Sequence, residues 1–238
     1  MEFEEAYKAI VDASIEKDTK EIPTILSCFD FDGLDCLEIG CGPYARLALH
    51  ISEEANHVTC LESNSKFAKE AKELVREEGR GYKIDVKEHQ VGDEYHLPFE
   101  DDSFDVVYGA WLPHKLTTDD NFLSEISRVS RKYVLLVMPG VDGDSPQLVS
   151  IIRPGEKERR ETYRRRISNS LVANGFYVDF KSDVLKMDYK NFQNIKEIYY
   201  CLDFKNKALL DKKQEVDEFL NARIHDFQNG FYCIWGEK

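Results

Sequence analysis

Short apolar runs alternate with helix-spaced apolar residues along the first 140 positions. The runs predict five strands, at residues 36–39, 58–62, 82–86, 104–109 and 133–138. Between them, apolar residues recur every three to four positions and predict helices at 44–54, 64–78 and 119–131. Such alternation is typical of an α/β fold with a doubly wound, mostly parallel sheet that helices cover on both faces.

The pattern continues differently toward both ends. Residues 2–18 predict an amphipathic helix that is interrupted before Pro23, and a later helix is predicted to stop at Asn174-Gly175. Apolar runs at 176–185 and 231–235 are expected to add a hairpin-like antiparallel edge, which makes a seven-stranded, Rossmann-like sheet. Helices at 192–203 and 211–227 are expected either to roof a pocket or to pack on the sheet.

One domain of 238 residues is therefore expected, without linkers or repeats. Its expected parts are an N-terminal helical cap at 1–30, a cofactor-binding half at 31–140, and an acceptor-side half at 141–238 with a helical insertion at 190–228. Residues 141–155 combine Gly and Pro with an apolar centre, which suits a mobile lid.

Composition narrows the class of protein. The net charge of −13 disfavours a nucleic acid as partner, since such binding normally depends on Lys and Arg. No apolar run is long enough to cross a membrane, and the N-terminus is acidic, so we expect a cytoplasmic protein. The six cysteines contain no C-x-x-C pair, and neither they nor the histidines have the spacing of metal ligands.

The stretch LDCLEIGCGPY, residues 34–44, joins a predicted strand to a tight glycine turn. Gly40, Gly42 and Ala45 formally satisfy the dinucleotide fingerprint G-x-G-x-x-G/A, with Glu62 twenty residues beyond the second glycine. A negative charge at Glu38 favours a cationic ligand over a diphosphate. Further on, VGDEYHLPFEDDSFDVVYG places Asp93 at the end of the third strand.

These motifs, in this order, resemble the class I S-adenosylmethionine-dependent methyltransferases, in the small-molecule branch known as type 11. The resemblance spans about residues 34–140 and rests on E-x-G-x-G, an acidic end of the second strand, and G-D-x-x-x-L-P-F-x-x-x-S-F-D. It implies S-adenosylmethionine as cofactor, with Glu38 near the methionine amino group and Gly40 and Gly42 beneath the cofactor. Glu62 would accept from the ribose hydroxyls and Asp93 from the adenine amino group.

The resemblance also implies that neighbouring positions line the cofactor, namely Cys41, Tyr44, Ser63, Glu94 and Gly109. The family usually carries a third glycine where this chain has Tyr44. An aromatic side chain there would crowd the methionine end of the cofactor or close over it.

The segment YGAWLPHKL, residues 108–116, follows the fourth predicted strand, where an acceptor would meet the methyl group. Family members often carry Leu-His-His here, and His114 aligns with the first histidine. His114 is a candidate general base, and a structural hydrogen-bonding histidine is the alternative. Trp111 is a candidate wall of the acceptor pocket, and simple core packing is the alternative.

Residues 153–166 hold six Arg and one Lys against three Glu. Arg160 and Arg164 lie four residues apart, on one face of a helix, and could clamp a carboxylate or phosphate on an anionic acceptor. A solvated face that balances nearby acids is the alternative.

Taken together, the sequence predicts a methyltransferase that transfers a methyl group by in-line displacement to a small-molecule acceptor. A nicotinamide-dependent oxidoreductase and a non-catalytic cofactor-binding or protein-interaction module remain alternatives, and a nucleic-acid methylase is supported only by the Arg-rich segment. Neither the acceptor atom nor the oligomeric state follows from the sequence.

Overall fold

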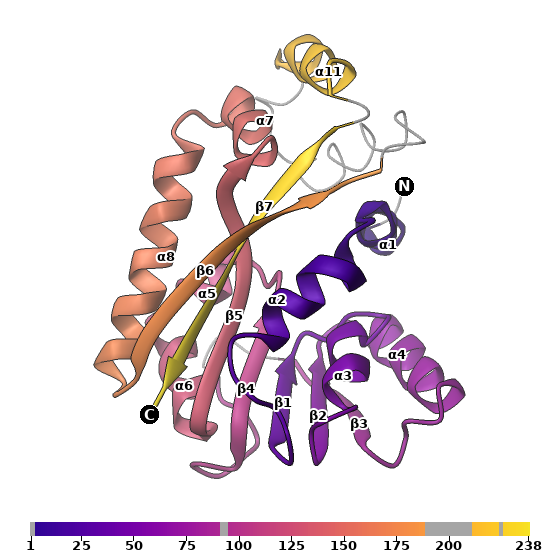
Figure 1. The fold of residues 1–238 in the computed structure, drawn as a ribbon, viewed down its shortest axis with the longest axis vertical. Coiled ribbons are helices and arrows are strands. Elements are labelled where there is room, and N and C mark those ends of the chain that lie inside the picture. The colour runs from indigo at the N-terminus through magenta and orange to yellow at the C-terminus, as the bar shows by residue number, and fades with distance from the viewer. Residues whose placement is uncertain (1–2, 91–94, 189–210, 224–225) are drawn as a thin grey trace. The chain divides into compact units, whose positions relative to one another are not determined.

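The computed structural model describes residues 3–90, 95–188, 211–223 and 226–238 (Figure 1). In these residues seven strands form one sheet, in the order β3-β2-β1-β4-β5-β7-β6. The strands are β1 (Asp35–Ile39), β2 (His57–Glu62), β3 (Ile84–Glu88), β4 (Phe104–Ala110), β5 (Ser130–Gly143), β6 (Tyr177–Lys186) and β7 (Gln228–Glu237). Strand β7 is antiparallel to the rest (Figure 1), which confirms the predicted mostly parallel, doubly wound sheet.

Strand order reverses at β1. From β1 the chain moves outward to β2 and β3, and it then returns to add β4 and β5 on the other side of β1. The crevice beyond the carboxyl ends of two strands at such a switch point is where open α/β sheets bind ligands. The candidate site is therefore expected at the carboxyl ends of β1 and β4.

Helices connect the strands and flank the sheet. They are α1 (Phe3–Ala13), the π-helical turn η1 (Lys17–Glu21), α2 (Ile22–Leu26), α3 (Arg46–Ile51), α4 (Ser65–Glu77), α5 (His114–Thr117), α6 (Asp120–Val129), α7 (Ser145–Ile152), α8 (Glu156–Ala173) and α11 (Lys213–Asn221). None of the helices in the described part of the chain combines the length and apolarity needed to cross a membrane.

Helix α4 illustrates how local sequence fixes an element. The Asn64 side chain caps its first turn by accepting from the amides of Lys66 and Phe67, at 3.0 and 3.1 Å. Phe67, Ala71 and Val75 recur at helical spacing and are buried where the helix packs against β2 and β3. Burial of Phe67 alone is worth about 1.5–3 kcal/mol.

The chain divides into two compact units. One unit consists of residues 1–23, 139–162 and 182–231, and the other of residues 24–138, 163–181 and 232–238. The second unit contains β1 to β4 and the first part of β5, and therefore the whole glycine turn.

A separate apolar cluster stabilises the first unit. It joins α1, α7 and α11 with residues near the ends of β6 and β7, through Ala6, Leu148, Met187, Val216, Leu220 and Phe227. Asp144 closes the same region, because its carboxylate accepts from Arg223 Nε and from the backbone amide of Gln228, both at 2.9 Å. The cluster packs α1 together with elements that follow β5.

In the second unit, the buried carboxylate of Asp105 ties the start of β4 to its neighbours. It accepts from the backbone amide of Asp35 at 3.1 Å and pairs with Arg131 and Lys132, each at 3.1 Å. Burial raises the pKa of Asp105, but the bonds to Asp35, Lys132 and Arg131 outweigh it, so the pKa lies below its ordinary value.

Several predicted elements differ in position. The third strand begins at Ile84 rather than Tyr82, and β5 extends well beyond 133–138 in both directions. The segment expected to be a lid instead contains α7, which has a proline in its first turn. Strand β7 lies between β5 and β6, so the sheet edge is β6. The helix predicted at 211–227 is represented by α11, and the one at 192–203 lies outside the described residues.

Candidate functional site

The chain turns sharply between β1 and α3. Gly40 and Gly42 both adopt positive φ, at 73° and 64°, a conformation that costs glycine little and other residues more. The Gly40 amide donates to Leu61 O on β2 at 2.7 Å, which anchors the turn to the neighbouring strand. The two glycines thus add no side chains of their own to the turn, which is fixed at the carboxyl end of β1.

The side chain of Leu112 covers this turn. A Cβ placed on Gly40 would lie 2.7 Å from Leu112 Cδ2, and one on Gly109 would lie 2.7 Å from Leu112 Cδ1. Both glycines therefore let a single leucine approach the ends of β1 and β4. Gly40 and Gly109, two of the positions predicted to line the cofactor, are therefore in contact with the side chain of Leu112.

Glu38 is buried just before the glycine turn. The strand register sets it beside Cys60 on β2 and Tyr108 on β4. Its Oε2 accepts from Tyr108 Oη at 3.3 Å, with Cys60 Sγ 3.8 Å away. Burial raises the pKa of Glu38 to about 7, even though Tyr108 and the charge of Arg46 oppose this rise. Glu38 thus changes charge near neutral pH.

Glu62 ends β2 and holds two loops together. Its Oε2 accepts from the Gly42 amide at 2.9 Å and its Oε1 from the Asn64 amide at 2.8 Å, while only 6% of the residue is exposed. An ionised carboxylate has about four acceptor positions, so each oxygen keeps one for a further donor. The carboxylate is therefore both oriented and able to accept from two more hydroxyls.

The remaining predicted cofactor residues lie around these two acids. Cys41 is buried in the turn, Tyr44 is half-buried at its far side, and Ser63 is exposed directly after Glu62. Gly109 is buried near the end of β4. Asp93 and Glu94 lie outside the described residues.

Residues 111–116, which follow β4 and are called the rim below, contain the two residues predicted to contact the acceptor, Trp111 and His114. Trp111 is half-buried with φ of 57°, and its amide donates to Val137 O on β5 at 2.8 Å. His114 begins α5, and its ring lies against Tyr163 of α8, with centroids 4.8 Å apart. Both residues belong to the unit that contains the glycine turn. Their roles toward an acceptor stay predictions.

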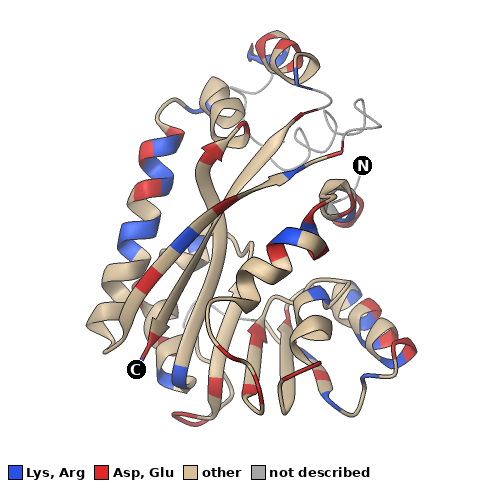
Figure 2. Ribbon diagram, viewed as in Figure 1, with Lys and Arg blue, Asp and Glu red and all other residues tan. Residues whose placement is uncertain are grey.

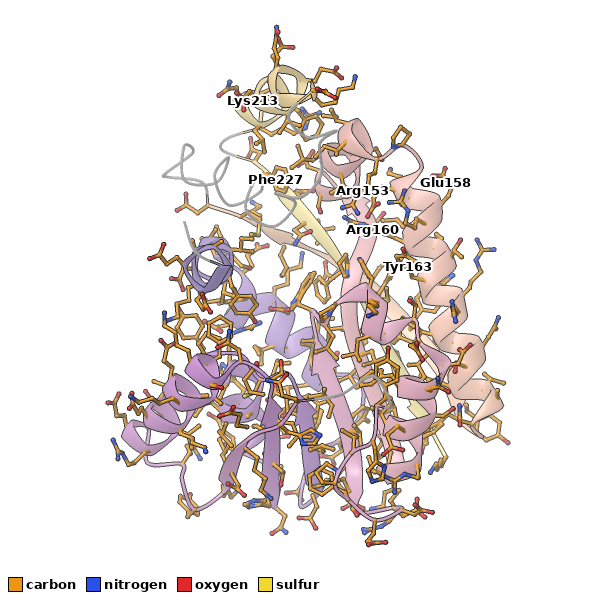
Figure 3. All side chains as sticks on the ribbon, turned by 180° about the vertical axis from the view of Figure 1, so that it is seen from behind. Arg153, Glu158, Arg160, Tyr163, Lys213 and Phe227 are labelled. Carbon is orange, nitrogen blue, oxygen red and sulfur yellow. The ribbon has the colours of Figure 1, made fainter. Side chains whose placement is uncertain are left out.

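Arg160 is bound within the protein. Only 4% of it is exposed, and it projects from α8 toward β5 (Figure 3). Its Nε pairs with Glu156 at 2.9 Å, Nη1 donates to Gly140 O at 2.7 Å, and Nη2 donates to Ser145 Oγ at 3.2 Å. This geometry favours a structural role, because all three nitrogens already have partners.

Arg164 lies one turn further along α8. Its guanidinium carbon is 4.0 Å from the ring centre of Phe180 on β6 and 5.7 Å from that of Tyr232 on β7. Figure 2 shows basic and acidic residues interleaved along α8. The two arginines therefore contact different partners, and a joint grip on an anionic acceptor remains a prediction without support from these contacts.

Three site residues escaped the sequence analysis. Tyr108 belongs to an apolar run that predicts a strand, and Tyr163 has a spacing that predicts only a helix. Leu112 lies in the segment 108–116, where only Trp111 and His114 were singled out. The signal for Tyr108 was its place in β4, since strands β1 and β4 end together and Tyr108 is level with Glu38. Within the described ranges, no three His, Cys, Asp or Glu side chains converge as metal ligands would.

Residues 37–138 match the family model described as a methyltransferase domain. The match covers β1 to most of β5, including the glycine turn, Glu62 and the rim. This part of the chain is a methyltransferase domain. The family resemblance predicted from the sequence is thereby confirmed. No curated protein sequence matches the chain.

Solved structures share the fold of the methyltransferase domain and its additions. The YcgJ protein from Bacillus subtilis has a TM-score of 0.64 at 17% identity, with 92% of this chain and 98% of that chain covered. The [4+2]-cyclase SpnF has a TM-score of 0.59 at 17% identity, with 92% and 80% covered.

A third similar structure is geranyl diphosphate C-methyltransferase from Streptomyces coelicolor A3(2), in complex with Mg²⁺, geranyl diphosphate and S-adenosyl-L-homocysteine. Its TM-score is 0.58 at 10% identity, with 92% of this chain and 79% of that chain covered. At such identities these likenesses establish the fold.

Proposed function

We propose that this protein is an S-adenosylmethionine-dependent methyltransferase that acts on a small molecule. The observation that carries the proposal is the Glu62 carboxylate, which two backbone amides orient at the end of β2 while each oxygen keeps a free acceptor position. A ribose diol supplies two hydroxyl donors and matches this arrangement. The methyltransferase-domain match over the same residues supports it.

The donor site would be formed by residues at the switch point. Glu62 would hold the ribose, the turn at Gly40 and Gly42 would lie beneath the methionine portion, and Glu38 would face its amino group. Bound S-adenosylmethionine would supply an electrophilic methyl group. An ammonium near Glu38 would favour the ionised carboxylate, which burial disfavours when no cation is present.

The acceptor would meet the methyl group near the rim after β4. In-line displacement needs alignment of the two reactants and exclusion of water more than it needs a strong acid or base. The aromatic faces of Trp111 and Tyr163 are suitable walls, because aromatic rings tolerate a neighbouring sulfonium. His114 would take up a proton where the acceptor must lose one during attack.

Calorimetric titration tests the donor. We expect S-adenosylmethionine and S-adenosylhomocysteine to bind and NADH not to bind, since a nicotinamide-dependent oxidoreductase would show the reverse. Glu62→Gln should weaken donor binding by about 1–3 kcal/mol, because the amide replaces one acceptor oxygen with a donor. Glu77→Gln on the exposed side of α4 is the control and should bind as wild type does. Equal affinity in all three proteins would remove Glu62 from the site.

Turnover distinguishes an enzyme from a binding module. Formation of S-adenosylhomocysteine is measured across a metabolite library with the wild-type protein and with His114→Asn. A small-molecule methyltransferase yields product with at least one acceptor, whereas a module binds the donor without converting it. The cyclase among the similar structures makes this test necessary, because the fold alone does not fix the reaction.

A further inference from the structure

Strand β6 forms one edge of the sheet, and the described part of the chain places no strand beyond it. Acidic and basic residues follow one another along β6 (Figure 2), and Asp179, Lys181 and Asp183 share one face because every second residue of a strand points the same way. Two aromatic residues of β6 are exposed, Tyr177 by 85% and Phe180 by 42%. An exposed edge of this kind is a template for pairing with another chain.

The carboxyl-terminal half of β6 is covered by the protein's own N-terminal segment. The carbonyl of Lys186 accepts from the Ile15 amide at 3.2 Å, and the carbonyl of Val184 accepts from Lys20 Nζ at 2.6 Å. Neither donor belongs to β7, so the even-numbered residues in this half direct their backbone groups away from β7. The edge is therefore closed from residue 184 onward.

The amino-terminal half of β6 is the open part of the edge. Backbone groups alternate in direction along a strand, so those of Val178, Phe180 and Ser182 point to the same side as those of Val184. The Phe180 amide donates to the carboxylate of its own neighbour, Asp179, at 2.7 Å, which an amide engaged with β7 would not do. This half of β6 thus presents outward-facing backbone groups that no described strand pairs with.

We propose that two copies of this chain associate through β6, antiparallel and about a two-fold axis at Phe180. Phe180 then faces Phe180 of the second copy, and Val178 faces Ser182 of the second copy. Each of the three resulting pairs exchanges two backbone hydrogen bonds, which uses every outward-facing group of the open half. The Phe180 amide leaves the Asp179 carboxylate for the carbonyl opposite. The ladder stops where the N-terminal segment closes the edge.

The charges of β6 select this register. With Phe180 on the axis, Asp179 of each copy lies directly opposite Lys181 of the other, so two pairs of opposite charge form on one face of the sheet. A slip of two residues keeps the same faces together but sets either Asp179 or Lys181 opposite its own copy. Directly opposed like charges are destabilising, so the slipped registers are disfavoured.

Contacts within each chain hold the side chains of this surface in place. Lys181 Nζ donates to Ser27 Oγ at 2.6 Å and lies 5.3 Å from the ring centre of Trp235. An ammonium has three donors, so Lys181 can reach a carboxylate of the second copy without losing Ser27. The ring of Phe180 meets that of Tyr232 edge to face, with centroids 6.0 Å apart. Side chains that are already ordered lose less conformational entropy when the two copies associate.

Sedimentation velocity of the full chain over a wide range of concentration tests the association. Wild type should be a reversible dimer, and Lys181→Asp should raise its dissociation constant by roughly tenfold or more, because two attractive pairs become repulsive. Adding Asp179→Lys to that variant reverses both charges and should restore the dimer. Lys69→Asp, at an exposed position of α4, is the control and should dimerise as wild type does.

Cross-linking tests the register. Opposed residues of a hydrogen-bonded pair have Cα atoms about 5.5 Å apart, within the range that a disulfide spans, so Phe180→Cys should link the two copies under mild oxidation. Lys181→Cys should link only in a slipped register. Peptide mapping without reduction identifies the linked position. A monomer at every concentration, a dimer that Lys181→Asp leaves unchanged, or faster linking through Lys181→Cys than through Phe180→Cys would overturn the proposal.

Discussion

The buried acid at the end of β1 makes a prediction about stability. Between the ordinary pKa of 4.5 and the folded value of about 7, the folded protein keeps a proton on Glu38 that the unfolded chain releases. The free energy of unfolding should therefore fall as pH rises through this window, at about 1.4 kcal/mol per pH unit. The difference of 2.5 between the two pKa values corresponds to a total loss of about 3 kcal/mol.

Glu38→Gln isolates this contribution, because the amide keeps the shape of the side chain and an acceptor for Tyr108 but cannot ionise. Below pH 4.5 the stability difference between wild type and variant should be constant, since Glu38 is then protonated in both the folded and the unfolded chain. From pH 4.5 to 7 the free energy of unfolding of the variant should rise by about 3 kcal/mol relative to that of wild type. Above pH 7 the difference should again be constant.

Urea unfolding at several pH values, followed by tryptophan fluorescence, measures this difference. The two tryptophans, Trp111 and Trp235, both lie in the unit that contains Glu38, so the signal reports on the relevant part of the chain. A stability difference independent of pH between 4.5 and 8 would refute the reasoning, because it would mean that Glu38 is ionised in the folded protein throughout.

Three further outcomes are expected. Binding of S-adenosylmethionine at pH 6.5 should release a proton from Glu38, so the calorimetric heat should depend on the ionisation enthalpy of the buffer. A heat that is the same in all buffers would mean that the methionine amino group does not lie near Glu38. Gly230→Ala should lower the free energy of unfolding by about 1–3 kcal/mol, since its Cβ would lie 2.3 Å from a backbone oxygen of β5, whereas Gly81→Ala, with open space around it, should change little in the same urea titration. Asp105→Asn should destabilise the protein at pH 7, and this loss should shrink in acid, because the stability that the lowered pKa of Asp105 provides is complete above its ordinary value of 3.8 and is lost as the pH falls below it. A constant loss down to pH 2.5 would contradict this prediction.

The order of elements and the place of the glycine turn could be predicted from the sequence. Strands and helices differ in the period of their apolar residues, and the paired glycines mark a turn whatever surrounds them. Glu38 and Glu62 followed from their positions at strand ends, and both acids lie at the carboxyl edge of the sheet as expected.

Contacts between strands could not be predicted in the same way. Tyr108 meets Glu38 only because β1 and β4 are neighbours in a particular register, and register is a property of the folded sheet. For the same reason, the sequence could not show that Arg160 is buried. Its partners Gly140 and Ser145 are brought to it by the packing of α8, and a basic run alone does not distinguish a solvated arginine from an enclosed one.

The expected lid shows a third limit. Pro146 and the nearby glycines suggested an irregular loop, yet a proline in the first helical turn is compatible with a helix and often begins one. The apolar centre of the segment then forms α7 and places Leu148 in the core shared with α1 and α11. The sequence alone could not distinguish an irregular loop from a helix here, because the helix depends on packing in that core.

Leu112 restricts which residues can stand at positions 40 and 109, which are far apart in the sequence. Its two methyl groups occupy the space that a side chain at Gly40 or Gly109 would need. Related proteins with alanine or serine at position 109 are therefore expected to have a shorter residue at position 112, so positions 109 and 112 should covary. Protein engineers who wish to widen this corner can use the same exchange, trimming position 112 before they alter either glycine.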